Sequence, residues 1–215
     1  MHPILTTLLA TAAAVPIGWW LRRDLETLVY RAADELDHPH PGPRKWITWT
    51  SVAAITSLAA TAAFSPDPLP YLTLLPLAIT GTWLAAVDLD VMRLPNRVLA
   101  PSGALTAAAA LIASLITKDP QAVVLALLGA LLAGGIYAGI HAATRGGIGY
   151  GDVKLAGVIG LALGPLSLTI VWVALLAGTI TAALWAKARH HSGPIPYGPW
   201  LLLGAWAAAL LPLGH

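Results

Sequence analysis

Long apolar stretches alternate with short polar segments along the whole chain. Most stretches have about 17–25 residues, the length that an α-helix needs to cross the hydrocarbon core of a bilayer. The apolar windows cover residues 3–21, 46–64, 69–87, 97–117, 121–143, 152–164, 165–186 and 198–213. The pattern predicts an all-α, polytopic transmembrane helical bundle with about eight spans. Because the sixth window is short and ends at Gly164-Pro165, seven spans are the alternative, with the sixth and seventh windows forming one broken unit.

The composition agrees with a membrane protein. The chain is 57% hydrophobic and only 10% charged, whereas soluble domains carry about 25% charged residues. No polar segment is long enough for a separate soluble domain, so we expect one integral membrane domain over residues 1–215. The first window lacks a basic start and is followed by Arg22-Arg23, which favours a retained span over a signal peptide. The absence of cysteine excludes disulfides, thiolate nucleophiles and cysteine zinc sites.

The basic residues are distributed unevenly over the two sides that eight spans define. One side carries Arg22, Arg23, Arg31, Arg44, Lys45, Arg93, Arg97, Arg145, Lys154, Lys187 and Arg189. The other side carries only Lys118. Since cytoplasmic connections are enriched in Lys and Arg, this pattern predicts a multi-pass protein of the cytoplasmic (inner) membrane with both termini extracytoplasmic.

The first polar segment, residues 22–45, is expected to be a short cytoplasmic loop. Its apolar residues recur at helical spacing, which is compatible with an amphipathic helix on the membrane surface. A solvated connector is the alternative.

Small residues recur inside the spans, as in Gly135-x-x-x-Gly139 and Gly157-x-x-Gly160. Such pairs let helix backbones approach closely. We therefore expect both pairs to lie at contacts between helices of a compact bundle.

Three acidic residues adjoin long apolar spans on the predicted cytoplasmic side: Asp88, Asp90 and Asp152. An ionisable group at a membrane boundary usually marks function. Asp88 and Asp90 are two residues apart, so on one helix their side chains point to nearly opposite faces. We expect Asp88, which is nearer the span, to face the bundle, and Asp90 to face water or a base such as Arg93.

Asp152 follows a glycine-rich segment, residues 146–151, whose backbone can approach another chain closely. A phosphate-binding loop is the first rival, but its Gly-Lys-Ser/Thr ending is missing and a carboxylate would repel phosphate. Lys154 is interpreted as an anchor at the membrane interface, with stabilisation of charge near the site as the alternative. The histidines of His38-x-His40 and His190-His191 lack a third ligand at a defined spacing, so no metal site is expected.

Three motifs, taken together, resemble those of the type IV prepilin peptidase family, membrane aspartyl proteases of the Gly-x-Gly-Asp class. Asp88 precedes Leu94-Pro95-Asn96, Gly149-x-Gly151-Asp152-x-Lys154 follows, and Ile195-Pro196-Tyr197-Gly198-Pro199 comes last. The resemblance implies that Asp88 and Asp152 are the catalytic pair. It also implies supporting motif positions at Gly149, Gly151, Lys154, Leu94, Pro95 and Asn96. Many family members have Asp where this chain has Asn96, a change outside the pair that should be tolerated.

The resemblance implies cleavage of a pilin-like precursor where its basic leader meets its apolar helix, at the cytoplasmic face. Two nearby carboxylates in a poorly solvated site share one proton, so they can activate water without a metal or a nucleophilic side chain. No cofactor and no nucleic-acid partner are expected, and membrane lipid surrounds the protein. Methylation of the product is not expected, because the paired cysteines and larger cytosolic segment of bifunctional members are missing.

Two alternatives remain open at this point. One is a small proton-coupled transporter that uses Asp88 and Asp152 as relay carboxylates. The other is an inactive family member that assists assembly. The transporter would place its acids deep in the spans and show repeated halves, whereas these acids lie at span ends.

Overall fold

The computed structural model describes residues 2–145, 147–190 and 193–211. Its α-helices are α1 (Pro3–Glu26), α2 (Lys45–Phe64), α3 (Leu75–Val91), α4 (Asn96–Thr117), α5 (Gln121–Ala143), α6 (Tyr150–Leu163), α7 (Leu168–Ala188) and α8 (Gly198–Ala209). Two 3-10 helices, η1 (Ala33–Glu35) and η2 (Leu69–Leu74), precede α2 and α3. The described residues contain no strand, so the predicted all-α architecture is confirmed. Each apolar window holds one α-helix, and α6 and α7 are separate helices instead of one broken unit.

Prolines and left-handed residues mark many helix ends. Pro3, Pro76 and Pro199 occupy first-turn positions, where the missing N–H leaves no hydrogen bond unmade. α3 ends at Met92, with φ 49°, and α4 ends at Lys118, with φ 56°. Left-handed residues of this kind close the last turn and redirect the chain. The short connections therefore keep consecutive helices together.

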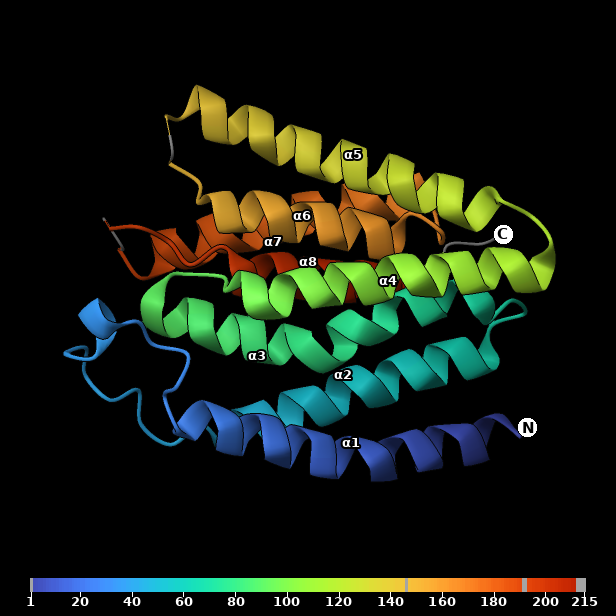
Figure 1. Cartoon of the computed structure of the whole chain (residues 1–215), viewed down its shortest axis with the longest axis horizontal. Coiled ribbons are helices and arrows are strands. Elements are labelled where there is room, and N and C mark those ends of the chain that lie inside the picture. Colours follow the sequence, from blue (N-terminus) through green and yellow to red (C-terminus); the bar gives the residue numbers. More distant parts are fainter. Residues whose placement is uncertain (1, 146, 191–192, 212–215) are drawn as a thin grey trace.

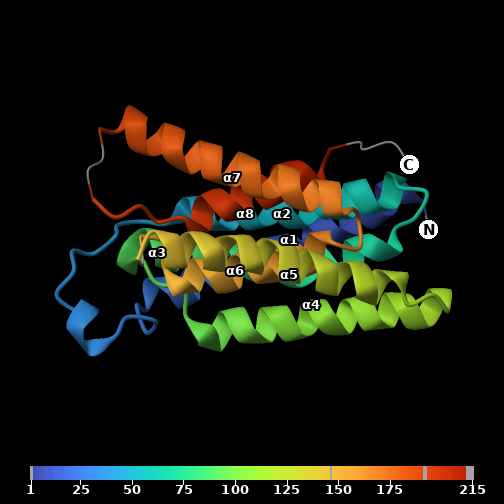
Figure 2. The ribbon, with the colours of Figure 1, turned by 90° about the horizontal axis from the view of Figure 1, so that it is seen from above.

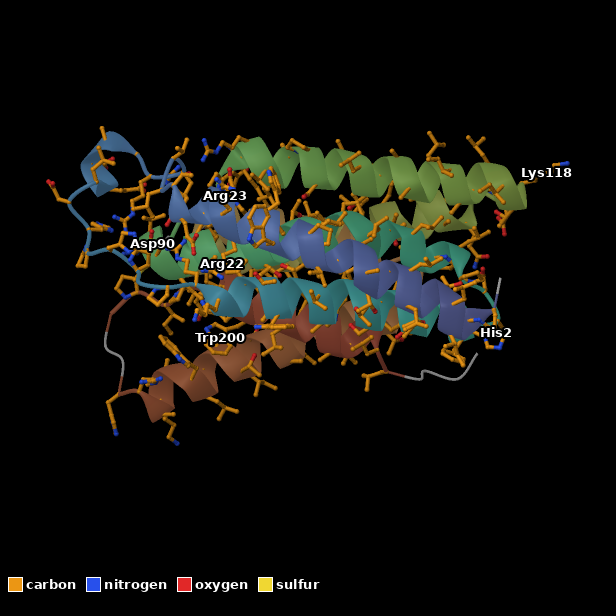
Figure 3. The ribbon with its side chains drawn as sticks, turned by 90° about the horizontal axis from the view of Figure 1, so that it is seen from below. His2, Arg22, Arg23, Asp90, Lys118 and Trp200 are labelled. Atoms are coloured by element: carbon orange, nitrogen blue, oxygen red, sulfur yellow. The ribbon has the colours of Figure 1, made fainter. Side chains whose placement is uncertain are left out.

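Consecutive α-helices run in opposite directions (Figure 1). The connections after α1, α3, α5 and α7 lie at one end of the bundle, on the left in Figures 1 and 2, and the others lie at the opposite end. Arg22, Arg23 and Asp90 lie toward the first end, whereas Lys118 and His2 lie at the opposite end (Figure 3). We call the first end the motif end, because both acidic motifs adjoin connections there.

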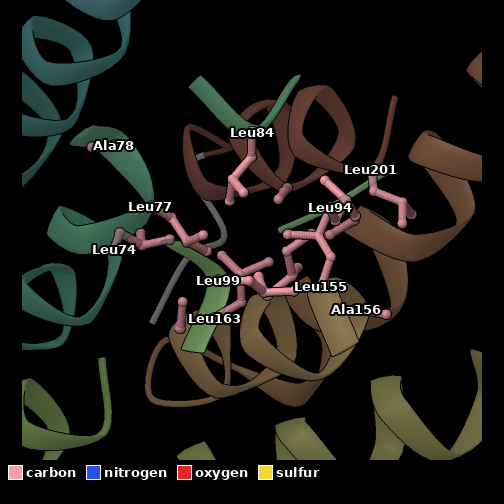
Figure 4. Packing of buried hydrophobic residues seen from close by; sticks show 14 of the residues in the cluster. Leu74, Leu77, Ala78, Leu84, Leu94, Leu99, Leu155, Ala156, Leu163 and Leu201 are labelled. Carbon is pink, nitrogen blue, oxygen red and sulfur yellow. The ribbon is translucent and has the colours of Figure 1, made fainter. Parts of the chain in front are cut away.

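Six helical segments of the described chain are long and apolar enough to cross a bilayer, with η2 and α3 counted together. α6 has 14 residues and α8 has 12, so they extend only about 21 Å and 18 Å. These two short helices and α3 are the most buried, with about half of their residues inside the protein. Leu84, Leu99, Leu155 and Leu201 of α3, α4, α6 and α8 belong to their shared core (Figure 4).

The outer faces of the bundle are apolar. Leu115 of α4, Leu131 of α5 and Leu184 of α7 are between 60% and 72% exposed. A helix that is apolar on its exposed face as well as on its buried face is typical of a membrane environment. The surface of the protein thus agrees with a multi-pass membrane protein.

Glycines bring α5 and α6 into close contact, but one predicted pair is wrong. Gly135 and Gly139 face open space, with no described atom within 4 Å of a Cβ built at either position. The close approach instead involves Gly129 and Gly160, because a Cβ on Gly160 would lie 2.1 Å from the backbone oxygen of Gly129. The sequence spacing was compatible with several faces of α5, and packing against α6 selects another one.

The segment between α1 and α2 does not form the amphipathic surface helix considered for residues 22–45. α1 continues to Glu26, and the rest of the segment contains only the three-residue helix η1 and irregular chain. Leu28 has a left-handed backbone, with φ 56°, which ends the helix soon after α1, and prolines that include Pro39 follow. The segment is held in place by ion pairs instead.

Candidate active site

Asp88 lies in the last turn of α3 and faces the interior of the bundle. The residue is 4% exposed. Its Oδ2 accepts a hydrogen bond from the backbone N–H of Gly198 over 2.9 Å, at the first residue of α8. The expectation that Asp88 faces the bundle is therefore confirmed. Within the described part of the chain, this buried carboxyl group has one hydrogen-bond donor, the N–H of Gly198.

Asp152 lies in the first turn of α6 and is 8% exposed. Its Oδ1 is buried and has no hydrogen-bond partner among the described residues. Its Oδ2 lies close to Gly149, where a built Cβ would be 3.1 Å away. Asp88 and Asp152 are near enough for their charges to repel each other. Two acids that are 64 positions apart in the sequence thus share one buried region at the motif end.

The two motif segments contact each other directly. Gly151 packs against Leu94, since a Cβ built on Gly151 would lie 3.1 Å from the Cβ of Leu94. Lys154 donates from Nζ to Oδ1 of Asn96 over 2.9 Å, and its Nζ lies 4.9 Å from the centre of the Tyr150 ring. Lys154 therefore joins α6 to the start of α4. This contact between the motifs was not among the two interpretations of Lys154 from sequence.

Asp90 points away from Asp88 and is held by bases other than the expected Arg93. Arg31 donates from Nε to Oδ2 over 3.0 Å and from Nη2 to Oδ1 over 2.9 Å. Nη2 of Arg44 lies 3.3 Å from Oδ2 of Asp90, and the Tyr30 hydroxyl also donates to this oxygen. Burial raises the pKa of Tyr30, so its phenol stays protonated as a donor. The side chains of Arg31, Arg44 and Asp90 are all 6% exposed or less.

Arg93 pairs with Glu35 of η1 instead. Its Nη2 lies 2.7 Å from Oε2 of Glu35 and also donates to the backbone oxygen of Tyr30 over 2.9 Å. The hydrogen bonds from Arg93 lower the pKa of Glu35 below its usual value. Asp90 and Glu35 thus fasten the segment between α1 and α2 to the end of α3. Asp90 therefore has ion-pair partners that hold the structure together, and Asp88 has none among the described residues.

Gly198 belongs to a motif found in the sequence, but no role was predicted for it. Arg31 and Arg44 were not predicted as partners of Asp90. The signal for Gly198 was available, because a Gly-Pro pair that opens an apolar window is typical of a helix N-terminus with free N–H groups. The partners of Asp90 are more than forty residues away in sequence and carry no local signal. Gly146 and His191, named in the sequence analysis, lie outside the described residues.

Comparison with known proteins decides the family. The model of the type IV leader peptidase family matches residues 74–186, which is more than half of the chain and includes both acidic motifs. The chain belongs to the type IV leader peptidase family. The matched region ends before Gly198, so the contact of Gly198 with Asp88 lies partly outside it.

Several curated family members resemble the chain. The prepilin leader peptidase/N-methyltransferase of Aeromonas salmonicida is 34% identical over 146 residues, which cover 62% of this chain and 48% of that protein. The Aeromonas hydrophila protein of the same name is 32% identical over 171 residues, covering 74% and 56%. The Bacillus subtilis protein is 34% identical over 133 residues, covering 59% and 50%. The chain thus spans about half the length of these relatives. No solved structure matches it with comparable significance.

Proposed function

We propose that this leader peptidase family member is an aspartyl endopeptidase that removes the basic leader from type IV prepilin-like precursors. The observation that carries the proposal is the buried pair of motif acids. Asp88 and Asp152 come from separate motifs, are nearly inaccessible, and lie near enough to repel each other. Such a pair holds a single proton between two carboxyl groups, which is the state that acid–base hydrolysis requires.

The reaction follows from that shared proton. The ionised carboxyl takes a proton from water, and the resulting hydroxide adds to the scissile carbonyl carbon. The protonated carboxyl donates to the carbonyl oxygen. When the C–N bond breaks, the leaving nitrogen takes up a proton from the pair, and a hydroxyl of the intermediate returns a proton to it, which restores the starting state. The side chains of Asp88 and Asp152 are sufficient for these steps.

Leu94, Pro95, Asn96, Gly149, Gly151 and Lys154 support this pair in our proposal. Their contacts join the start of α6 to the turn after α3, which fixes the distance between the helices that carry the acids. Gly149 and Gly151 leave room for close packing beside Asp152 and Leu94. Loss of these contacts would separate the two carboxyl groups.

We propose that the site acts at the cytoplasmic face of the inner membrane. Both acids lie at helix ends next to the connections of the motif end, and eleven of the twelve Lys and Arg residues follow the pattern expected for cytoplasmic connections. A precursor whose apolar helix lies in the bilayer would present its leader junction at this level. The basic leader would then remain in the cytosol.

We do not expect this chain to methylate its product, although the names of its relatives include this activity. Those proteins are named as N-methyltransferases as well as peptidases. The chain contains no cysteine, and only residues 27–44 lie between α1 and α2. We therefore expect a cut product with an unmodified N-terminus.

The decisive experiment incubates the purified protein in lipid with a prepilin-like precursor and maps the product by mass spectrometry. We expect a single cut after the basic leader, and its loss in Asp88→Ala and Asp152→Ala. Asp37→Ala serves as a matched control, because Asp37 is an exposed acid on the same side. Full cleavage by Asp152→Ala would contradict the proposed site. A mass increase on the new N-terminus, with a methyl donor present, would contradict the expected lack of methylation.

The proton-coupled transporter is not favoured by the family match. It would predict proton uptake that is lost in the same two variants, with no change in the mass of any precursor. The cleavage assay therefore separates the two functions.

A further inference from the structure

We propose that the backbone N–H of Gly198 positions Asp88 and makes it the ionised member of the aspartate pair, so that Asp152 carries the shared proton. The inference rests on the peptidase function proposed above and divides the roles within that site. The N–H of Gly198 donates to Oδ2 of Asp88 over 2.9 Å, and both groups are buried. A hydrogen bond from a buried donor to a charged acceptor is among the strongest that a protein forms.

Gly198 also sets where the Asp88 carboxyl can lie. A Cβ built on Gly198 would be 2.9 Å from Oδ2, 3.2 Å from Cγ and 3.4 Å from Cβ of Asp88. The carboxyl group is therefore seated directly against the α-carbon of Gly198. Any side chain at this position must push Asp88 away from the N–H. Pro199 fixes the first turn of α8 behind this contact.

The helix ends alone would favour the opposite assignment. Asp152 is in the first turn of α6, where negative charge is stabilised, and Asp88 is in the last turn of α3, where it is not. A direct hydrogen bond to a charged group, however, stabilises it about two to three times as much as a helix end does. Oδ1 of Asp152 is buried without a partner in the described part of the chain. The backbone of Gly149 also stabilises a charge on the Asp152 carboxyl, but the buried oxygen without a partner penalises that charged form.

Few other titratable groups act on the pair. Tyr137 of α5 and Tyr197, which precedes α8, interact electrostatically in this region, and Tyr137 also interacts with Asp152. A phenol is uncharged near neutral pH, so neither tyrosine decides which acid ionises. The buried arginines of the motif end, Arg31 and Arg44, are paired with Asp90. The order in which the two acids ionise thus depends on the hydrogen bond from Gly198 to Asp88, set against the buried Oδ1 of Asp152 that has no partner among the described residues.

The assignment defines each proton transfer. Asp88 accepts a proton from water, whose oxygen bonds to the carbonyl carbon, while Asp152 gives its proton to the carbonyl oxygen. As the C–N bond breaks, Asp88 returns its proton to the leaving nitrogen, and the hydroxyl of the intermediate returns a proton to Asp152. All atoms balance, and the free enzyme regains its starting protonation.

The first test does not depend on activity. Carbon-13 NMR of protein labelled at the aspartate carboxyl follows Asp88 in Asp152→Asn and Asp152 in Asp88→Asn. We expect Asp88 to ionise at the lower pH of the two. Adding Gly198→Ala to Asp152→Asn should raise the pH at which Asp88 ionises by about one unit. Adding Gly135→Ala, a control position with no described atom within 4 Å of its new Cβ, should leave it unchanged.

A second variant removes the N–H without adding atoms. Replacing Gly198 by glycolic acid in cell-free translation exchanges the N–H for an ester oxygen. This exchange should raise the pH at which Asp88 ionises, as Gly198→Ala does. The reverse order of ionisation, or no shift in either Gly198 variant, would overturn the proposal.

The cleavage assay supplies an independent result. In Gly198→Ala the acid limb of the pH profile of the cleavage rate should move to higher pH. If Gly198 were only structural, the amount of folded protein would fall while the acid limb stayed in place, which would also overturn the proposal. If the wild-type protein cut no precursor, the proposed function would fail, whereas the NMR titration would still decide the order of ionisation.

Discussion

At the scale of single residues, two acids separated by one position have unlike surroundings. Asp88 meets a backbone N–H and a second carboxyl group, whereas Asp90 meets two guanidinium groups and a phenol. The two guanidinium groups stabilise the negative charge on Asp90. No ion pair among the described residues involves Asp88. The difference follows from the helical period, which turns the two side chains to opposite faces.

The first prediction concerns Asp90→Ala. This substitution leaves the buried Arg31 and Arg44 without their carboxylate, and breaking a buried ion pair in this way costs about 3–5 kcal/mol. We expect a clearly lower midpoint of thermal unfolding in detergent. Cleavage per folded molecule should persist, because the Asp88 and Asp152 carboxyl groups remain.

The control for this prediction is Asp37→Ala, which removes an exposed acid from the same connection. It should leave the unfolding midpoint within the error of the wild type. An Asp90→Ala protein as stable as the control would show that Arg31 and Arg44 find other acceptors. Complete loss of cleavage in well-folded Asp90→Ala would mean that Asp90 takes part in the chemistry.

At the residue scale, part of the candidate site could be predicted from the sequence. Motif order identified Asp88 and Asp152 as a candidate pair, and helical geometry separated Asp88 from Asp90. The contact between Lys154 and Asn96, and the ion pairs of Arg31 and Arg44, depend on how distant segments pack. Such contacts cannot be predicted from a local sequence pattern.

At the scale of the elements, length and burial divide the helices into two groups. α3, α6 and α8 are the most buried, and they carry Asp88, Asp152 and Gly198. The remaining helices expose apolar faces. The apolar windows predicted all of these helices, since length and hydrophobicity are local properties. They did not predict which helices form the centre, because uniformly apolar helices have no polar face to orient them.

The second prediction concerns Gly160, which lies in the contact of α5 with α6. In Gly160→Ala the new Cβ would lie 2.1 Å from the backbone oxygen of Gly129. Because backbone atoms cannot turn aside, the helices must separate, and overpacking of this kind typically costs about 1–3 kcal/mol or more. We expect a lower unfolding midpoint and weaker cleavage, since α6 carries Asp152.

The matched variant for this prediction is Gly135→Ala on the exposed face of α5. Its new Cβ meets no described atom within 4 Å, and alanine favours a helix over glycine by about 0.5–1 kcal/mol. The unfolding midpoint should therefore stay equal or rise slightly. Equal losses in both variants would contradict the contact between Gly129 and Gly160.

At the scale of the whole molecule, the bundle is polarised. The acidic pair, the contacts between the motifs and the ion pairs of the segment between α1 and α2 all lie at the motif end, whereas Lys118 lies at the opposite end. A leader that remains in the cytosol can reach the pair only if the motif end faces the cytosol. The orientation of the molecule in the membrane is thus a requirement of the proposed function, and it can be tested without any substrate.

The absence of native cysteine makes this last test direct, because a single introduced thiol has no background. Asp37→Cys places a thiol in the connection after α1, and Asp119→Cys places one after α4, at exposed positions toward opposite ends of the bundle. Since basic connections stay in the cytoplasm, a membrane-impermeant maleimide should label Asp119→Cys in intact cells. It should label Asp37→Cys only after permeabilisation. Labelling of Asp37→Cys in intact cells would put the acidic pair on the side away from the leader and would contradict leader removal at the cytoplasmic face.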